Sequence, residues 1–188
     1  MWWHDRRKMM AMAARTALVM SLSCLLAGCF QPVYGDYSLS GGPSLRQRLS
    51  GVEVSRIDAP SASAEARVAV ELRDALIFEF TGGSSGAAPT HRLKVQISSS
   101  RQQVIVDITT SRPDVELVGF TASYSLIEIA TGKGVLSGST FARASYDIPG
   151  QQQRFAGARG QLDAQRRTVK VMAENIRSRL ASYFAAGS

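Results

Sequence analysis

Apolar and polar residues alternate over much of the chain between residues 91 and 148. The alternation is clearest in residues 93–97, 104–108 and 118–126, and it resumes in 135–148 after a Gly-containing stretch. A period of two residues indicates β-strands that bury one face. Neighbouring runs joined by short turns of this kind are typical of antiparallel pairs. We therefore predict that three or four strands of an antiparallel sheet form here.

Helical spacing replaces the alternation on both sides of this region. Apolar residues recur three and four positions apart in residues 62–80 and again beyond residues 149–153. A short strand at residues 52–57 precedes the first helix, for which Ser61 or Ser63 is the expected N-cap. This order allows both helices to cover one face of a single sheet. We predict an α+β fold, a two-layer sandwich with two helices on one face of a mixed, mostly antiparallel sheet of four or five strands.

The first 28 residues have the order of a bacterial lipoprotein signal. Basic residues come first and an apolar run from Thr16 to Gly28 follows, as in export signals. A membrane-spanning helix needs roughly 20 apolar residues, so we expect this shorter run to direct export rather than to remain as an anchor. The run ends in Leu26-Ala27-Gly28-Cys29, which has the pattern of a lipobox.

Cys29 is therefore the expected lipidation site. In such lipoproteins the thiol receives a diacylglyceryl group, the leader is removed before the cysteine, and the new amine is usually acylated. One acyl chain binds a bilayer only marginally, so two or three chains are needed for stable anchoring. Phe30 occupies the position after the cysteine, where an Asp would favour retention in the inner membrane. We therefore expect the protein to be anchored at the periplasmic face of the outer membrane. The alternative is an ordinary signal peptide with a chance cysteine.

The expected organisation is a signal peptide at residues 1–28, a lipidated tether at 29–50 and one α+β domain at 51–188. The tether is inferred from its Gly and Pro residues and its few apolar positions. A mature chain of this length is long enough to bury the core of a single domain. Because Cys24, the only other cysteine, lies in the leader, we expect the mature protein to have no disulfide.

Few residues of the mature chain suit catalysis or metal binding. His91 is its only histidine, so any Ser-His or Cys-His arrangement would need that one imidazole. The same count excludes metal sites built from clustered His and Cys. The TGKG segment at residues 131–134 lacks the spacing of a phosphate-binding P-loop and is expected to be a hairpin turn. We expect a surface strand position for His91, no enzymatic activity and no metal or other cofactor.

The basic face of the last helix does not require a nucleic acid partner. Asp163 lies four residues before Arg167, and Glu174 lies three residues before Arg177. Such spacings pair opposite charges on one helix. Part of the net charge of +7 also belongs to the leader. We therefore expect a solvated helix surface.

Three stretches of the chain resemble the LptE family of lipopolysaccharide-assembly lipoproteins, and the resemblance extends over nearly all of the mature chain. They are CFQPVYG at residues 29–35, the hairpin YSLIEIATGKGVLSG at 124–138, and residues 145–184 with their Ser-Tyr strand end and Ala-rich final helix. No single motif is diagnostic, but the order and spacing together are fairly specific. One departure is Phe30, which directly follows the lipidated cysteine where many members have Gly.

The resemblance implies a non-enzymatic role. Such proteins lie inside the lumen of the outer-membrane β-barrel LptD, help it to fold, and bind lipopolysaccharide on its way to the outer leaflet. Thr121, Ser123 and Ser125 are expected on the exposed face of the sheet, which would suit a hydrated lumen, although ordinary sheet polarity explains them equally well. The alternatives are an auxiliary periplasmic lipoprotein of another lipid-transport (ABC-type) system and a lipoprotein hydrolase that would depend on His91.

Arg112, Arg154 and Arg159 are the candidate lipopolysaccharide-binding residues. Consecutive hairpin turns of an antiparallel meander lie at alternate ends of the sheet. The turn with Arg112 is therefore expected at the same end as the start of the last helix, and opposite Lys133. Arginine can bind a lipid A phosphate through two parallel hydrogen bonds, and the helix start adds partial positive charge. The alternative is a group of unrelated, solvated arginines.

Overall fold

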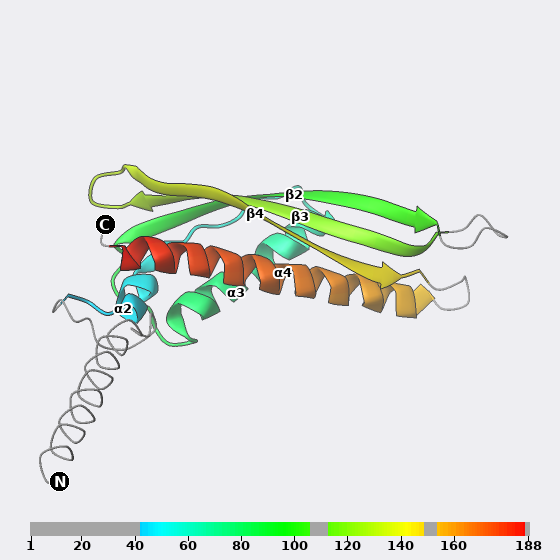
Figure 1. Ribbon diagram of the computed structural model, residues 1–188, viewed down its shortest axis with the longest axis horizontal. Coiled ribbons are helices and arrows are strands. Elements are labelled where there is room, and N and C mark those ends of the chain that lie inside the picture. Colours follow the sequence, from blue (N-terminus) through cyan, green and yellow to red (C-terminus); the bar gives the residue numbers. More distant parts are fainter. Residues whose placement is uncertain (1–41, 106–112, 149–153, 187–188) are drawn as a thin grey trace, which may run out of the picture. The chain divides into compact units, whose positions relative to one another are not determined.

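The computed structural model describes residues 42–105, 113–148 and 154–186. All of these residues belong to one compact unit, Ser38–Ser188. Within it the order of elements is helix, strand, helix, three strands and helix (Figure 1). The elements are α2 (Leu45–Ser50), β1 (Val52–Val54), α3 (Ala64–Thr81), β2 (His91–Ile105), β3 (Pro113–Glu128), β4 (Gly134–Asp147) and α4 (Arg154–Ala185).

The four strands form one sheet in the order β1-β2-β3-β4. The short strand β1 is parallel to β2 and pairs with it only from Val52–His91 to Val54–Leu93. The remaining neighbours, β2 with β3 and β3 with β4, are antiparallel. The predicted α+β class and the mixed, mostly antiparallel sheet are thus confirmed, with four strands. Residues 91–105 form one long strand rather than two short ones.

Helix α3 forms where the apolar spacing predicted it. The Ser63 side chain caps its start by accepting a hydrogen bond from the backbone N–H of Ala66 at 3.1 Å, which satisfies one of the free donors of the first turn. Gly82 ends the helix with φ 64°, a left-handed conformation that glycine adopts without steric cost. The buried face of the helix consists of Val68, Ala69, Leu72, Leu76 and Phe80.

Helices α3 and α4 lie on the same face of the sheet (Figure 1). Met172, Ile176 and Leu180 of α4 have no more than a trace of exposed surface. Near the end of this helix Phe184 is buried while Tyr183 is half-buried. The two helices are also joined by a salt bridge of 3.3 Å between Glu79 Oε2 and Arg177 Nη1.

Part of the segment expected to be a tether is instead folded. Residues 45–50 form α2, which is capped by the Ser44 side chain. Leu49 is only 3% exposed and belongs to the hydrophobic core. These six residues therefore pack with the domain. Within the described part of the chain, no helix combines the length and apolar character needed to cross a membrane.

Candidate functional site

The structure places only part of the predicted arginine group. Cys29 and Arg112 lie outside the described residues. Arg154 is the first residue of α4, and Arg159 is exposed in the second turn of that helix. These turns lie against the end of β4, since a Cβ on Gly160 would be 3.5 Å from the Cβ of Tyr146. The grouping of all three arginines remains a prediction.

The two ends of the sheet are distinct, as the hairpin argument requires. Asp147 at the end of β4 pairs with Val115 near the start of β3, so the start of α4 lies at this end. Lys133 lies in the turn between β3 and β4, at the opposite end (Figure 1). That turn is a tight hairpin in which Gly132 has φ 68°. We call the first end, where α4 begins, the arginine end.

A buried carboxylate lies beneath the start of α4. Glu116 of β3 pairs with Tyr146 of β4 and is 9% exposed. Burial of the tyrosine, together with its hydrogen bond to Glu116, raises the pKa of Tyr146 to about 12. The phenol therefore stays protonated at physiological pH. Glu116 is thus inside the fold at this end, whereas Asp147 and Arg159 are exposed on its surface.

The face of the sheet opposite the helices is polar across three strands, and we call it the open face. The predicted exposure of Ser123 is confirmed, and Thr121 and Ser125 are half-buried on the same face. Strand register places hydroxyl, amide and basic side chains beside them. These neighbours are Lys94, Gln96, Ser98, Ser100 and Gln102 of β2 and Ser137, Ser139, Arg143 and Ser145 of β4, all of them exposed.

Phe141 is the one large apolar side chain of β4 on the open face, and it is 52% exposed. Its ring lies over Gly119, where an added Cβ would be 3.1 Å from a ring carbon. On the other face Tyr124 covers Gly138 in the same way, with its hydroxyl 2.7 Å from the position of an added Cβ. An aromatic ring over a strand glycine fills the space that a side chain would otherwise occupy.

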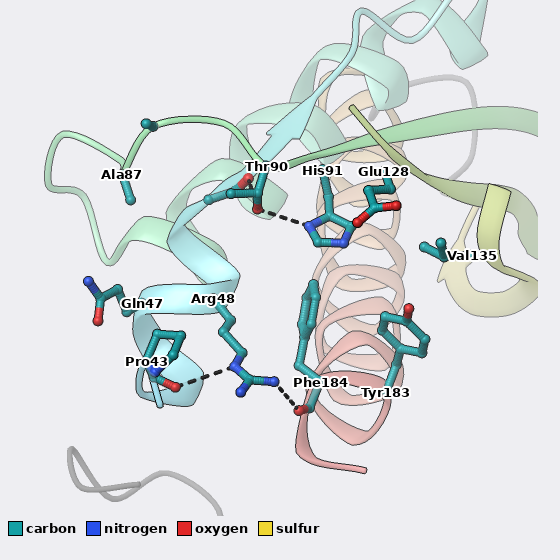
Figure 2. A pocket seen from close by; sticks show the side chains of 12 residues that line it. Pro43, Gln47, Arg48, Ala87, Thr90, His91, Glu128, Val135, Tyr183 and Phe184 are labelled. Carbon is teal, nitrogen blue, oxygen red and sulfur yellow. Dashed lines mark hydrogen bonds between the residues drawn. The ribbon is translucent and has the colours of Figure 1, made fainter. Parts of the chain in front are cut away.

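A cavity of about 730 Å³ lies at the opposite end from the arginine end. Figure 2 shows that α2, the segment before β2, the ends of β2 and β3, and the last turn of α4 contribute its walls. Its lining residues are Pro43, Gln47, Arg48, Gly51, Ala87, Ala88, Thr90, His91, Glu128, Val135, Tyr183 and Phe184.

Arg48 and His91 are two of the polar residues that line this cavity, and Figure 2 shows both beside Phe184. Arg48 donates hydrogen bonds to the carbonyl oxygens of Pro43 at 3.3 Å and Phe184 at 3.0 Å, and so ties α2 to the end of α4. The His91 ring meets Phe184 edge to face, with centroids 5.2 Å apart. Its Nδ1 lies 2.9 Å from Oγ1 of Thr90.

His91 is half-buried rather than on the surface, which corrects the position expected from the sequence. Burial lowers the pKa of its imidazole, and the nearby Glu128 carboxylate opposes this shift. The ring is therefore mainly neutral near pH 7. It begins β2, as the alternation predicted, but the fold turns it toward Phe184. The arrangement is that of a packing and hydrogen-bonding group in a mixed apolar and polar cavity.

Sequence reasoning missed this cavity because its walls come from distant parts of the chain. Arg48 and Phe184 are 136 positions apart, and the short helix that carries Arg48 lies in a stretch expected to be a tether. The available signal was Leu45 and Leu49, which have the i, i+4 spacing of one helix face. Two apolar residues are too few to predict a helix.

Comparison with solved structures supports the fold. A protein from Caulobacter crescentus CB15 that is provisionally called a lipoprotein matches 77% of this chain and 97% of its own length, with a TM-score of 0.60 and 20% identity. Lipoprotein B from Nitrosomonas europaea matches 80% and 94%, with 13% identity, but its TM-score is only 0.49 and adds no further support. No protein-family model matches the sequence, and no curated protein does. At such identities the similarity shows a shared fold.

The lowered pKa of His91 predicts that acid destabilises the folded protein at this position. The imidazole binds a proton less tightly in the folded state than in the unfolded state, in which its pKa is near 6.5. The contribution of the neutral His91 ring to the stability of the folded state is therefore complete above this pH. It is lost as the pH falls below 6.5 and through the lower pKa of the folded state. The free energy of unfolding from urea titration should fall more steeply below pH 6.5 in the wild type than in His91→Asn, which does not titrate there. Equal pH dependence of the two proteins would contradict this assignment.

Proposed function

We propose that this protein is an outer-membrane lipoprotein that assists the folding of the LptD barrel, plugs its lumen and binds lipopolysaccharide during its insertion into the outer leaflet. The observation that carries the proposal is the open face. It is three strands wide and mainly polar among the described residues, although Leu117 and Phe141 also lie on it. A surface of this kind can lie in a hydrated lumen without the cost of exposing a large apolar patch.

Two further points support the proposal. The sequence resembles the LptE family from the lipobox to the final helix, and the fold is shared with the Caulobacter protein. The helices also seal only one face of the sheet, so that the other remains available to a partner. The same features would suit an auxiliary lipoprotein of another lipid-transport system, and the partner that is bound separates the two functions.

Depletion of the protein tests whether it assists the assembly of the LptD barrel. We expect the barrel to be misassembled, as seen from the loss of its heat-modifiable form on gels, and the outer membrane to become permeable to large hydrophobic antibiotics. Affinity purification from outer membranes should recover the barrel and lipopolysaccharide. Normal barrel levels with unchanged antibiotic sensitivity would remove the assembly role, and recovery of an inner-membrane complex would favour the ABC-type alternative.

The lipid anchor is tested at Cys29, which supplies the thiol. The Cys29→Ala protein should incorporate no palmitate and should accumulate as uncleaved precursor, or as soluble protein if another peptidase cuts it. Metabolic labelling with palmitate and membrane fractionation measure both effects, with the wild type as the reference. Labelling of Cys29→Ala at the wild-type level would rule out this anchor.

Lipopolysaccharide binding is proposed at the arginine end, through Arg112, Arg154 and Arg159. Replacing Arg112 and Arg159 together by Asp should weaken binding by about tenfold or more, because hydrogen bonds to charged groups contribute about 1.5–3 kcal/mol each. Lys133→Asp, which changes the same charge at the opposite end, is the matched control. Binding to purified lipopolysaccharide is measured alongside circular dichroism and barrel co-purification, which should not change. If Lys133→Asp weakens binding as much as the double change, attraction is non-specific.

A further inference from the structure

Strand β4 forms an edge of the sheet, and its backbone groups alternate between two directions. In an antiparallel ladder, residues that bond to the neighbouring strand alternate with residues whose N–H and C=O groups point away from it. The Leu93 carbonyl of β2 accepts a hydrogen bond from the N–H of Ser55, so Leu93 points away from β3. Carried through the register of the sheet, this alternation makes Ser137, Ser139, Phe141, Arg143 and Ser145 point outward from β4.

Only one end of this outward row is covered. Nη2 of Arg167 donates to the carbonyl oxygen of Ser145 at 2.8 Å, which agrees with the outward direction of that residue. Within the described residues, no hydrogen bond reaches the outward backbone groups of Ser137, Ser139, Phe141 and Arg143. Unpaired edges of this length are usually blocked or covered, because they can pair with another strand. We call residues 137–143 the free edge.

Exposed apolar side chains lie beside the free edge on both faces of the sheet. Phe141 is 52% exposed on the open face, and Val171 of α4 is 44% exposed. Val171 is one helical turn from Arg167 and from Asn175, which both contact β4. The Asn175 contact is a hydrogen bond of 3.1 Å from its Nδ2 to Oγ1 of Thr140. Residues four apart lie on one helix face, so Val171 lies along the strand between these two contacts.

The charge beside the free edge is positive. Arg143 is exposed on the open face and forms no ion pair with any described residue. Arg167 lies at the same end of the edge, although Asp163 partly balances it at 2.9 Å. A strand added here would therefore gain from a carboxylate near Arg143 and from apolar side chains next to Phe141 and Val171.

We propose that the free edge of β4 binds an extended segment of a partner polypeptide, which adds to the sheet as a further strand. Side chains alternate between the faces of a strand, so successive residues of the segment would pack beside Phe141 and beside Val171. Main-chain hydrogen bonds supply affinity in this mode, and the side-chain neighbours supply specificity. The preferred segment therefore has apolar or partly apolar residues at successive positions and carries a carboxylate. The free edge uses the outward backbone groups of β4, whereas the proposed function rests on the side chains of the open face and of the arginine end, so the two can be tested separately.

A designed peptide tests the backbone requirement directly. The probe is a fluorescent peptide of alternating Val and Thr with Glu at both ends, titrated with the full chain in detergent and followed by fluorescence anisotropy. Its control has the same side chains but a methyl group on every backbone nitrogen, which removes all main-chain donors. We expect the anisotropy of the unmethylated peptide to rise as the full chain is added up to millimolar concentration. The methylated peptide should show no binding over the same range.

Ser139→Pro tests the protein side of the same hydrogen bonds. Proline removes the outward N–H at this position and is tolerated on an edge strand when that group faces solvent. We expect binding to weaken at least about fivefold, since one main-chain hydrogen bond is lost and the proline ring also blocks the approach of the peptide. Ser139→Ala, which loses the hydroxyl but keeps the N–H, should bind as the wild type does.

Val171→Lys is a second variant, which replaces Ser139→Pro in the test if circular dichroism shows that Ser139→Pro does not fold. It alters only an exposed helix position and should also weaken peptide binding. The proposal fails if the peptide does not bind, if the methylated peptide binds equally well, or if both folded variants bind like the wild type. It also fails if sedimentation shows that the wild type dimerises and Ser139→Pro does not, because the edge would then be occupied by a second copy.

Discussion

Val118, Phe120 and Leu126 of the central strand β3 have no exposed surface, and neither do Leu72 and Leu76 of α3. Burial of each such side chain contributes about 1.5–3 kcal/mol relative to exposure. Since the expected mature chain contains no second cysteine, this contact between one sheet face and two helices must hold the fold without disulfides. It also fixes the register, because a slip by one residue would move the apolar side chains to the open face.

The side chains of the open face consequently have little role in the core. Along β2, Leu93 and Val95 are buried while Lys94 and Gln96 between them are exposed. Substitution of the exposed set leaves the packing under the helices unchanged, so that this side of the sheet can be adapted to a partner. The same division explains why the open face, the arginine end and the free edge all lie outside the helix-covered face.

The sequence was sufficient for features that depend on local periodicity, such as the buried face of α3, and it narrowed the cap of that helix to Ser61 or Ser63, of which the structure shows Ser63. Features that depend on distant segments were not predictable. His91 is half-buried because Phe184 meets it from the far end of the chain, and neither residue has a pattern that indicates the other. Likewise, nothing in the alternation indicates that Phe141 covers Gly119 of the neighbouring strand. That packing explains why an aromatic ring remains on a polar face.

The long helix α4 gives the two ends of the domain different electrostatic character. Its N-terminus carries partial positive charge and its C-terminus partial negative charge. At the C-terminal end Arg48 compensates the helix by donating to the Phe184 carbonyl oxygen. At the N-terminal end the first turn has no acidic residue, and Arg154 and Arg159 add to the positive charge. Arg154, which lies in the first turn, is unfavourable by about 0.3–1 kcal/mol, a cost that binding of an anionic ligand at the arginine end would offset.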